Sequence, residues 1–230
     1  MSRSDAYQKF LQSKQIGYEQ WREGEGYDLE AFRQMKPDER DEVAREIREM
    51  ARWDWRDLDV LGAHGSPESI ERLRHIIAER DQRMRTRASA LSTLIDIDQT
   101  PGSVADVQLA HLIDEIDDED DLLPALDLAS WHGEAMTNLA LLRGAQDRPS
   151  ISLHYAARLL DVAKLSDDMA AFDPKFRPTL LRLLPDNDQH DRAAAFKQIC
   201  DWLKIDQADI PPRGSGQERR WAEAKWPKKM

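Results

Sequence analysis

Apolar residues recur along the chain with the 3.6-residue period of an α-helix, and strict alternation of apolar and polar residues is almost absent. The apolar stripes are Val43, Ile47, Met50 and Ala51; Ile70, Leu73, Ile76 and Ile77; Met84, Ala88, Leu91 and Ile95; Leu109, Leu112, Ile113 and Ile116; Leu122, Leu123, Leu126 and Ala129; Met136, Leu139, Ala140 and Leu142; Ile151, Tyr155, Leu159 and Val162; and Phe196, Ile199, Cys200 and Leu203. Short connections that carry Gly, Pro or Asp separate these stripes. The pattern predicts an all-α chain of many short helices.

Residues that start helices support this prediction. Pro37 precedes two acidic residues, which favour the first turn of a helix because the N-terminal end of the helix dipole is positive. Ser66 is a predicted N-cap, and Pro67 follows it at the first helical position. Helices therefore should begin at Pro37 and Pro67.

A repeated unit is visible from residue 81 onward. An acidic turn precedes an alanine-containing helix in "DQRMRTRASALSTL" from Asp81, "DEDDLLPALDLASW" from Asp118, "DRPSISLHYAARLL" from Asp147 and "DQHDRAAAFKQICDWL" from Asp188. The alanines at 88, 125, 157 and 194 are 37, 32 and 37 residues apart. A chance spacing within a helical bundle is the alternative, but the recurring turn chemistry favours stacked helix pairs.

The aspartate turn followed by a basic residue and then "Ala…Leu", as in Asp81, Arg85, Ala88 and Leu91, resembles HEAT-type helical repeats. The segments "YEQWREGEGYDLEAFRQMKPDERDEV" and "DWRDLDVLGAHGSPESIERLR" are also similar to bacterial HEAT-like proteins, some of which are immunity proteins found beside secreted toxins. The resemblance covers residues 53–203. It departs from the pattern where the Asp118 unit lacks the basic residue, at Pro124, and in an irregular insertion at 166–176.

The resemblance implies an α-solenoid of HEAT-like antiparallel helix pairs at 53–210, with an N-terminal helical cap at 1–52. The remaining residues, 211–230, form a basic tail with Trp221 and Trp226. The tail is either mobile or folded back onto the acidic body. We expect partial docking, because two exposed indoles are costly in water.

The charge balance restricts the class of partner. Of the 230 residues, 40% are hydrophobic and 33% are charged, and the net charge is −11. The tail has six basic and two acidic residues, so the first 210 residues carry −15. Such a chain repels nucleic acid and anionic membranes and favours a basic protein partner. With one cysteine and no apolar leader or membrane-spanning run, the expected location is the cytoplasm.

The most acidic stretch is "IDEIDDEDDLLPAL" at 113–126, in which seven of the eight residues from Asp114 to Asp121 are acidic. A calcium loop of the EF-hand type needs Gly at its sixth position, but counting from Asp117 places Leu122 there. Adjacent exposed acids also lack the separated environments that give a glycosidase its acid and base. A solvated loop and a docking surface for a cationic partner therefore remain open.

Other chemical motifs are weak. His111 and Glu115 have helical i, i+4 spacing, which favours a local ion pair over half of a metal site, and no HExxH motif occurs. Gly214-Ser215-Gly216 reads as a linker, and Cys200 as a small buried hydrophobe. The sequence therefore predicts no catalytic residues, no metal site and no cofactor.

The candidate site is an acidic binding surface. Equivalent turns of a solenoid stack along one edge, so the sequence predicts a ridge that continues from residues 96–98 to the run at 114–121. Tryptophans such as Trp53, Trp55 and Trp131 are either core residues or aromatic anchors of this face. The candidate partner-binding residues are Asp96, Asp98, Asp114, Glu115, Asp117, Asp118, Glu119, Asp120, Asp121 and Trp131.

The predicted function is a non-catalytic immunity protein that neutralises a basic toxin, such as a nuclease, as a monomer or weak dimer. One alternative is a general scaffold or adaptor that binds a peptide or a partner helix. A second is a HEAT-like DNA-alkylpurine glycosylase, which the acidity of the chain disfavours because such an enzyme needs a basic channel for phosphates.

Overall fold

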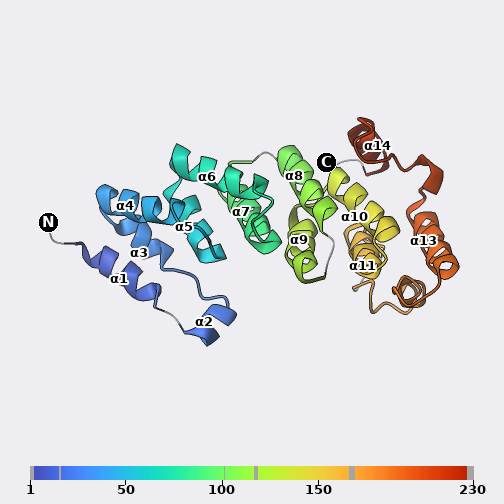
Figure 1. Cartoon of the computed structure of the whole chain (residues 1–230), viewed down its shortest axis with the longest axis horizontal. Helices are drawn as coiled ribbons and strands as arrows, with labels where there is room; N and C mark the ends of the chain where they lie inside the picture. Colours follow the sequence, from blue (N-terminus) through green and yellow to red (C-terminus); the bar gives the residue numbers. More distant parts are fainter. Residues whose placement is uncertain (1–2, 16, 101, 117–118, 166–168, 227–230) are drawn as a thin grey trace. The chain divides into compact units, whose positions relative to one another are not determined.

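A computed structural model describes residues 3–15, 17–100, 102–116, 119–165 and 169–226 (Figure 1). Throughout these residues the regular secondary structure is helical, which confirms the prediction of an all-α chain. The chain divides into two compact units, Met1–Pro101 and Gly102–Met230. The predicted boundary between cap and repeats at residue 52 falls inside the first unit. In the described part of the chain, no helix is long and apolar enough to cross a membrane.

The first unit is built from short helices, and from the fourth helix onward each contacts its neighbour in sequence and the next helix but one. The helices are α1 (Asp5–Ser13), α2 (Tyr18–Arg22), α3 (Leu29–Gln34), α4 (Pro37–Arg48), α5 (Trp55–His64), α6 (Pro67–Ala78) and α7 (Met84–Asp96). Helix α4 contacts α5 and α6, and α7 contacts α5 and α6. Helix α3 lies against α1 and α5. The core of this unit therefore forms between successive helix pairs.

Local sequence signals set several of these helix boundaries. The Ser66 hydroxyl accepts a hydrogen bond from the backbone N–H of Ser69, and Pro67 begins α6, as predicted. Helix α4 begins at Pro37, also as predicted, but it ends at Arg48 before the end of its apolar stripe. Gly65 ends α5 in the left-handed region with φ 66°, a conformation that costs little without a Cβ.

The second unit contains α8 (Gly102–Glu115), α9 (Glu119–His132), α10 (Ala135–Asp147), α11 (Ser152–Val162), α12 (Arg177–Leu181), α13 (Gln189–Leu203), the 3₁₀ turn η1 (Gln207–Asp209) and α14 (Glu218–Lys225). Helix α10 contacts α8, α11, α13 and α14, while α9 contacts α8 and α11. Figure 1 shows α10 with α11 and α14 as neighbours. Helix α10 is the centre of this unit.

A carboxylate from another helix holds the start of α10. Asp106 on α8 is buried and accepts hydrogen bonds from the backbone N–H groups of Glu134, Met136 and Thr137, at 2.8, 2.8 and 3.0 Å. The residue at the N-cap position, Glu134, makes no side-chain cap of its own. Since the first N–H groups of a helix have no partner within it, Asp106 supplies the missing acceptors and joins α8 to α10.

Two glycines allow helices to cross closely. A Cβ at Gly62 on α5 would lie 2.5 Å from Cγ2 of Thr93 on α7. A Cβ at Gly144 on α10 would lie 2.7 Å from the ring of Tyr155 on α11. Both distances are far below van der Waals contact. The helix crossings therefore depend on the absence of a side chain at these two positions.

The C-terminal residues pack against α10, as expected from their two tryptophans. Trp221 and Trp226 make an edge-to-face contact with ring centroids 5.7 Å apart, and both pack on a small core that includes Leu139 and Ala222. The buried Arg143 guanidinium donates to the carbonyl of Pro211 and to Glu218. The described part of the tail is thus a folded element of the second unit.

Candidate partner-binding surface

The acidic candidates of the first unit lie at the end of α7. Asp96 is its last residue and Asp98 follows in the left-handed region with φ 56°, and both side chains are exposed. Asp59 on α5 is half-buried nearby, and burial raises its pKa to about 6, with Asp96 and Asp54 adding to the rise. The Thr93 hydroxyl donates a hydrogen bond to the Asp59 carboxylate at 3.4 Å, which opposes the rise in pKa. This end of the unit presents carboxylates close together.

Asp114, the first acidic residue of the run, is engaged within the second unit. Its carboxylate lies 3.2 Å from the guanidinium of Arg213 and 3.8 Å from that of Arg143. Burial raises the pKa of Asp114, and these two arginines together with Arg148 oppose the rise. Arg148 also donates to the carbonyl of Ile113 at 3.1 Å. The negative end of α8 is therefore surrounded by arginines of its own unit.

The other residues of the run are only partly described. Glu115 ends α8 and is half-buried, and Asp121 on α9 is half-buried. Glu119 and Asp120 begin α9, where the backbone alone is described, while Asp117 and Asp118 lie outside the described residues. The predicted ridge would join these positions to Asp96 and Asp98 in the other unit, so it stays a prediction.

The tryptophans divide between core and surface. Trp53 is buried, and its Nε1 donates to the carbonyl of Ile47 at 2.7 Å, which fits the core reading. Trp55 is half-buried at the start of α5. Trp131, near the end of α9, is 83% exposed. An indole with that much of its surface in water is the feature of this unit that most suggests a binding role.

Trp131 belongs to a face of α9 that we call the α9 face, formed by Leu123, Asp127 and Trp131. These residues follow one another at i, i+4 and i+8, and each is exposed. Arg158 of α11 lies 3.8 Å from the carboxylate of Asp127 and donates to the hydroxyl of Ser130. The α9 face thus combines apolar groups with a carboxylate that is held by a neighbouring helix.

More exposed apolar side chains follow α11. Met169 and Phe172 are 62% and 63% exposed, and the Asp161 carboxylate accepts a hydrogen bond from the backbone N–H of Ala170 at 2.6 Å. This bond fixes the segment to the end of α11. The sequence predicts an irregular insertion at 166–176 and gives no signal for Met169 and Phe172, because the segment has no helical period.

A groove of about 770 Å³ opens where α9 ends, α10 begins and α11 ends. We call it the α10 groove; the lining residues used below are Ser130, Glu134, Asn138, Asp161, Lys164, Lys225 and Trp226. Sequence reasoning did not find it, since its lining comes from four separate helices and has no motif of its own.

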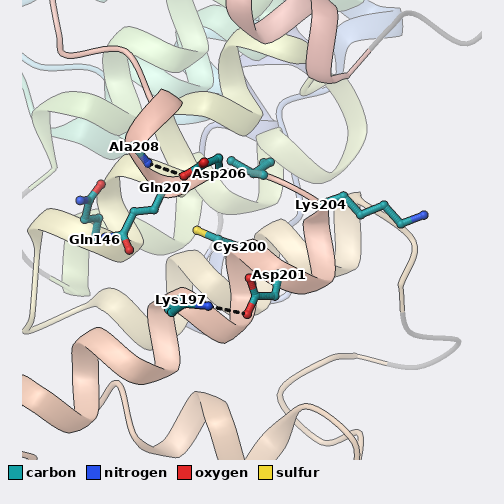
Figure 2. Close-up of a pocket in the computed structure, with 9 residues that line it drawn as sticks. Gln146, Lys197, Cys200, Asp201, Lys204, Asp206, Gln207 and Ala208 are labelled. Carbon is teal, nitrogen blue, oxygen red and sulfur yellow. Dashed lines mark hydrogen bonds and ion pairs between the residues drawn. The ribbon is translucent and has the colours of Figure 1, made fainter.

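A second hollow of about 910 Å³ lies between the end of α10 and α13 (Figure 2). Gln146 and residues 205–208 border it, and the Lys197 ammonium pairs with Asp201 at 3.1 Å. Cys200 is buried there, and burial raises the pKa of its thiol to about 11. A protonated, buried thiol is a poor nucleophile, so Cys200 contributes chiefly to packing.

Comparison of the chain with protein-family models, with curated proteins and with solved structures gives no match. Among the described residues, no group of three or more His, Cys, Asp and Glu side chains is placed to hold a metal ion. The geometry of the surface is therefore the basis on which a function can be argued.

Proposed function

We propose that the protein is a non-catalytic binding protein, and most specifically an immunity protein that neutralises a basic toxin in the cytoplasm. The observation that carries the proposal is Trp131, an exposed indole on a chain of net charge −11. Exposed tryptophans are frequent anchors of protein interfaces, and an acidic surface attracts a basic partner over a distance.

The helix contacts support the architecture that this role requires. In the first unit, α4 and α5 form one pair and α6 and α7 the next, with α4 against α6 and α5 against α7. In the second unit, α8 and α9 pair, as do α10 and α11, with α8 against α10 and α9 against α11. Pairs that stack helix by helix in this way are the building principle of an α-solenoid. The predicted cap at 1–52 includes α4, but α4 contacts α5 and α6, so within the proposal α4 belongs to the first pair and the cap is limited to α1–α3.

Exposed carboxylates and apolar anchors have different tasks in such a complex. Asp96 and Asp98 are exposed at a helix end and can steer a cationic protein toward the surface. Asp114 is already paired with two arginines, so we assign it to the fold rather than to direct contact. Trp131, with Leu123 beside it on the α9 face, would supply the area that is desolvated in the complex.

A general scaffold or adaptor is the second candidate, and the α10 groove favours it, because a groove of about 770 Å³ can take a peptide segment without any toxin. A base-excising glycosylase is disfavoured by the −15 charge of the first 210 residues.

Substitution of Trp131 tests the proposed interface. The partner to use is a basic protein encoded by the gene adjacent to that of this protein. Surface plasmon resonance would measure binding, and co-expression would measure neutralisation. Trp131→Ala should weaken binding by about 2 kcal/mol or more, roughly thirtyfold, without lowering the melting temperature, since the side chain is 83% exposed.

Leu181→Ala is the matched control, because it also removes an exposed apolar side chain from the second unit but lies outside both the α9 face and the lining of the α10 groove. Equal affinities of the wild type and the Trp131 variant would remove this residue from the interface. The absence of any basic partner protein beside the chain would favour the adaptor instead.

A further inference from the structure

Asn138 is a buried polar side chain without a partner at the α10 groove. The residue is 6% exposed, it lines the groove, and its side-chain oxygen accepts no hydrogen bond within the described residues. Its backbone N–H is satisfied by the carbonyl of Glu134 at 3.0 Å, so the unmet acceptor belongs to the carboxamide. Buried acceptors are almost always paired in folded proteins. Because rotation of a carboxamide by 180° exchanges its oxygen and nitrogen, this acceptor can be presented to a group that enters the groove lined by Asn138.

The lining indicates what kind of group this is. Glu134 and Asp161 contribute carboxylates, Lys164 and Lys225 contribute ammonium groups, and Trp226 contributes an indole. The two signs balance, so the groove does not select an ion by charge. A lining that combines polar groups with an indole suits a neutral group that carries both a donor and an acceptor.

The peptide group meets this description. A carboxamide and a peptide unit each carry one N–H donor side and one C=O acceptor, so they can pair in either orientation of the Asn138 side chain. The volume of about 770 Å³ lies within the range of roughly 300–1,000 Å³ that is typical of ligand sites. An extended chain also leaves its main-chain groups open to such pairing, whereas a helix does not.

Exposed apolar residues adjoin the groove lining in the sequence. Trp131 directly follows Ser130 of the lining, and Met169 and Phe172 are within two residues of Ala170, whose backbone N–H donates to the lining residue Asp161. A charge-balanced groove with exposed apolar residues close to its lining in the sequence, on an otherwise acidic chain, has the composition of an interface centre, which is depleted in net charge and surrounded by charged residues.

We propose that the α10 groove binds an extended segment of a basic polypeptide, and that the Asn138 carboxamide recognises a main-chain peptide group of that segment. The inference rests on the proposed binding function and names its site. Acidic residues elsewhere on the chain attract the positively charged segment, and the groove holds its backbone without reading its side chains.

The test uses the full chain and a short capped peptide of alternating lysine and alanine, measured by calorimetric titration. Asn138→Leu preserves the size of the side chain and removes its polar atoms. It should weaken binding at least tenfold, about 1.4 kcal/mol, while raising the melting temperature, because an unpaired buried acceptor is removed. A purely structural asparagine would not give these two opposite shifts.

Gln108→Leu is the matched control. Gln108 on α8 also has an unpaired buried side-chain oxygen, but it does not line the groove. This variant should gain stability and bind the peptide like the wild type. A peptide with N-methylated main-chain nitrogens should bind the wild type at least tenfold more weakly, a result that requires no variant to fold.

Binding that is unaffected by both Asn138→Leu and N-methylation would overturn the inference, even if the protein binds a basic partner through other residues. Conversely, Asn138-dependent binding of the peptide would stand even if removing acidic residues left association with the basic partner unchanged. In that case the proposed acidic docking surface would be wrong, and the proposed peptide site in the α10 groove would stand.

Discussion

Asp59 and Asp114 are carboxyl groups that folding partly removes from water, but their surroundings differ. Asp59 has the Thr93 hydroxyl beside it and, among the described residues, no ion-pair partner, and burial raises its pKa to about 6. Burial also raises the pKa of Asp114, but the guanidinium groups of Arg143 and Arg213 lie close to this carboxylate and favour its charged form. The ionisation of Asp59 therefore opposes folding at neutral pH, without an arginine beside it to favour the charged form.

The pH dependence of the first unit's stability should reflect Asp59. Between an ordinary unfolded pKa near 4 and the folded value of about 6, the folded state binds more protons. Stability from this group is thus full at the acidic end of that window and is lost as the pH rises through it. At pH 7, Asp59→Asn should raise the free energy of unfolding by about 1–2 kcal/mol, after allowance for solvent screening of a half-buried group.

Denaturant titrations at several values between pH 4 and 8 would measure this effect. The variant should show a smaller decline in stability across the window than the wild type. Asp81→Asn is the control, because Asp81 is an exposed aspartate of the same unit. Parallel pH profiles for the wild type and the Asp59 variant would contradict the prediction.

At the scale of the element, the helix starts show which features sequence can and cannot predict. Ser66 caps α6 by accepting a hydrogen bond from the backbone N–H of Ser69, three positions later. Because this spacing is local, the cap can be predicted from the sequence. The cap of α10 comes from Asp106, which is 28 residues before Glu134. No local rule connects these two residues, because the pairing exists only once α8 and α10 have packed together.

The same distinction applies to the candidate surface. Trp131 was identified because its residue type and its proximity to the acidic run are visible in the sequence, although its exposure was not decided there. The engagement of Asp114 by Arg213 joins residues almost a hundred positions apart, and Asn138 has no distinguishing motif. The composition therefore indicates which charged residues are present. Tertiary contacts determine which of them are already in ion pairs within the protein.

Removal of the Asp106 carboxylate should destabilise the second unit selectively. Asp106→Ala leaves three backbone N–H groups at the start of α10 without their acceptor. We expect a loss of about 2 kcal/mol or more in the free energy of unfolding, since a helix cap is removed and buried donors are left unpaired. Differential scanning calorimetry would measure it.

Asp161→Ala offers a comparison for the Asp106 variant, because Asp161 accepts a single backbone hydrogen bond in the same unit. The loss in free energy of unfolding caused by Asp161→Ala should be clearly smaller than that caused by Asp106→Ala. If both substitutions had the same small effect, the bonds from Asp106 would not be the element that secures α10.

At the scale of the whole molecule, the net charge of −11 should influence how fast a basic partner arrives more than how tightly it is held. Replacing Asp117, Asp118, Asp120 and Asp121 together by Asn should lower the association rate. The difference should shrink at high salt, because the Debye length falls to about 3 Å at 1 M. Stability should hold or rise, since clustered like charges repel one another.

Stopped-flow mixing at several salt concentrations would measure the association rate. The control removes the same number of charges from exposed positions of the first unit, by replacing Glu19, Glu23, Glu46 and Glu49 with Gln. If the run is a docking surface, the control should slow association less. Identical rates for the two variants would mean that only the total charge matters and that the run is a solvated loop.

The central position of α10 also imposes an order on how the second unit can open. Helix α9 contacts α8 and α11, so it can separate from them while the four helices that contact α10 keep it covered. Helix α10 contacts α8, α11, α13 and α14, and its first turn is tied to α8 through Asp106. Solvent therefore reaches the backbone of α10 only after several helices have separated. The α9 face, with its exposed Trp131, can fluctuate to fit a partner without loosening the helix that holds the unit together.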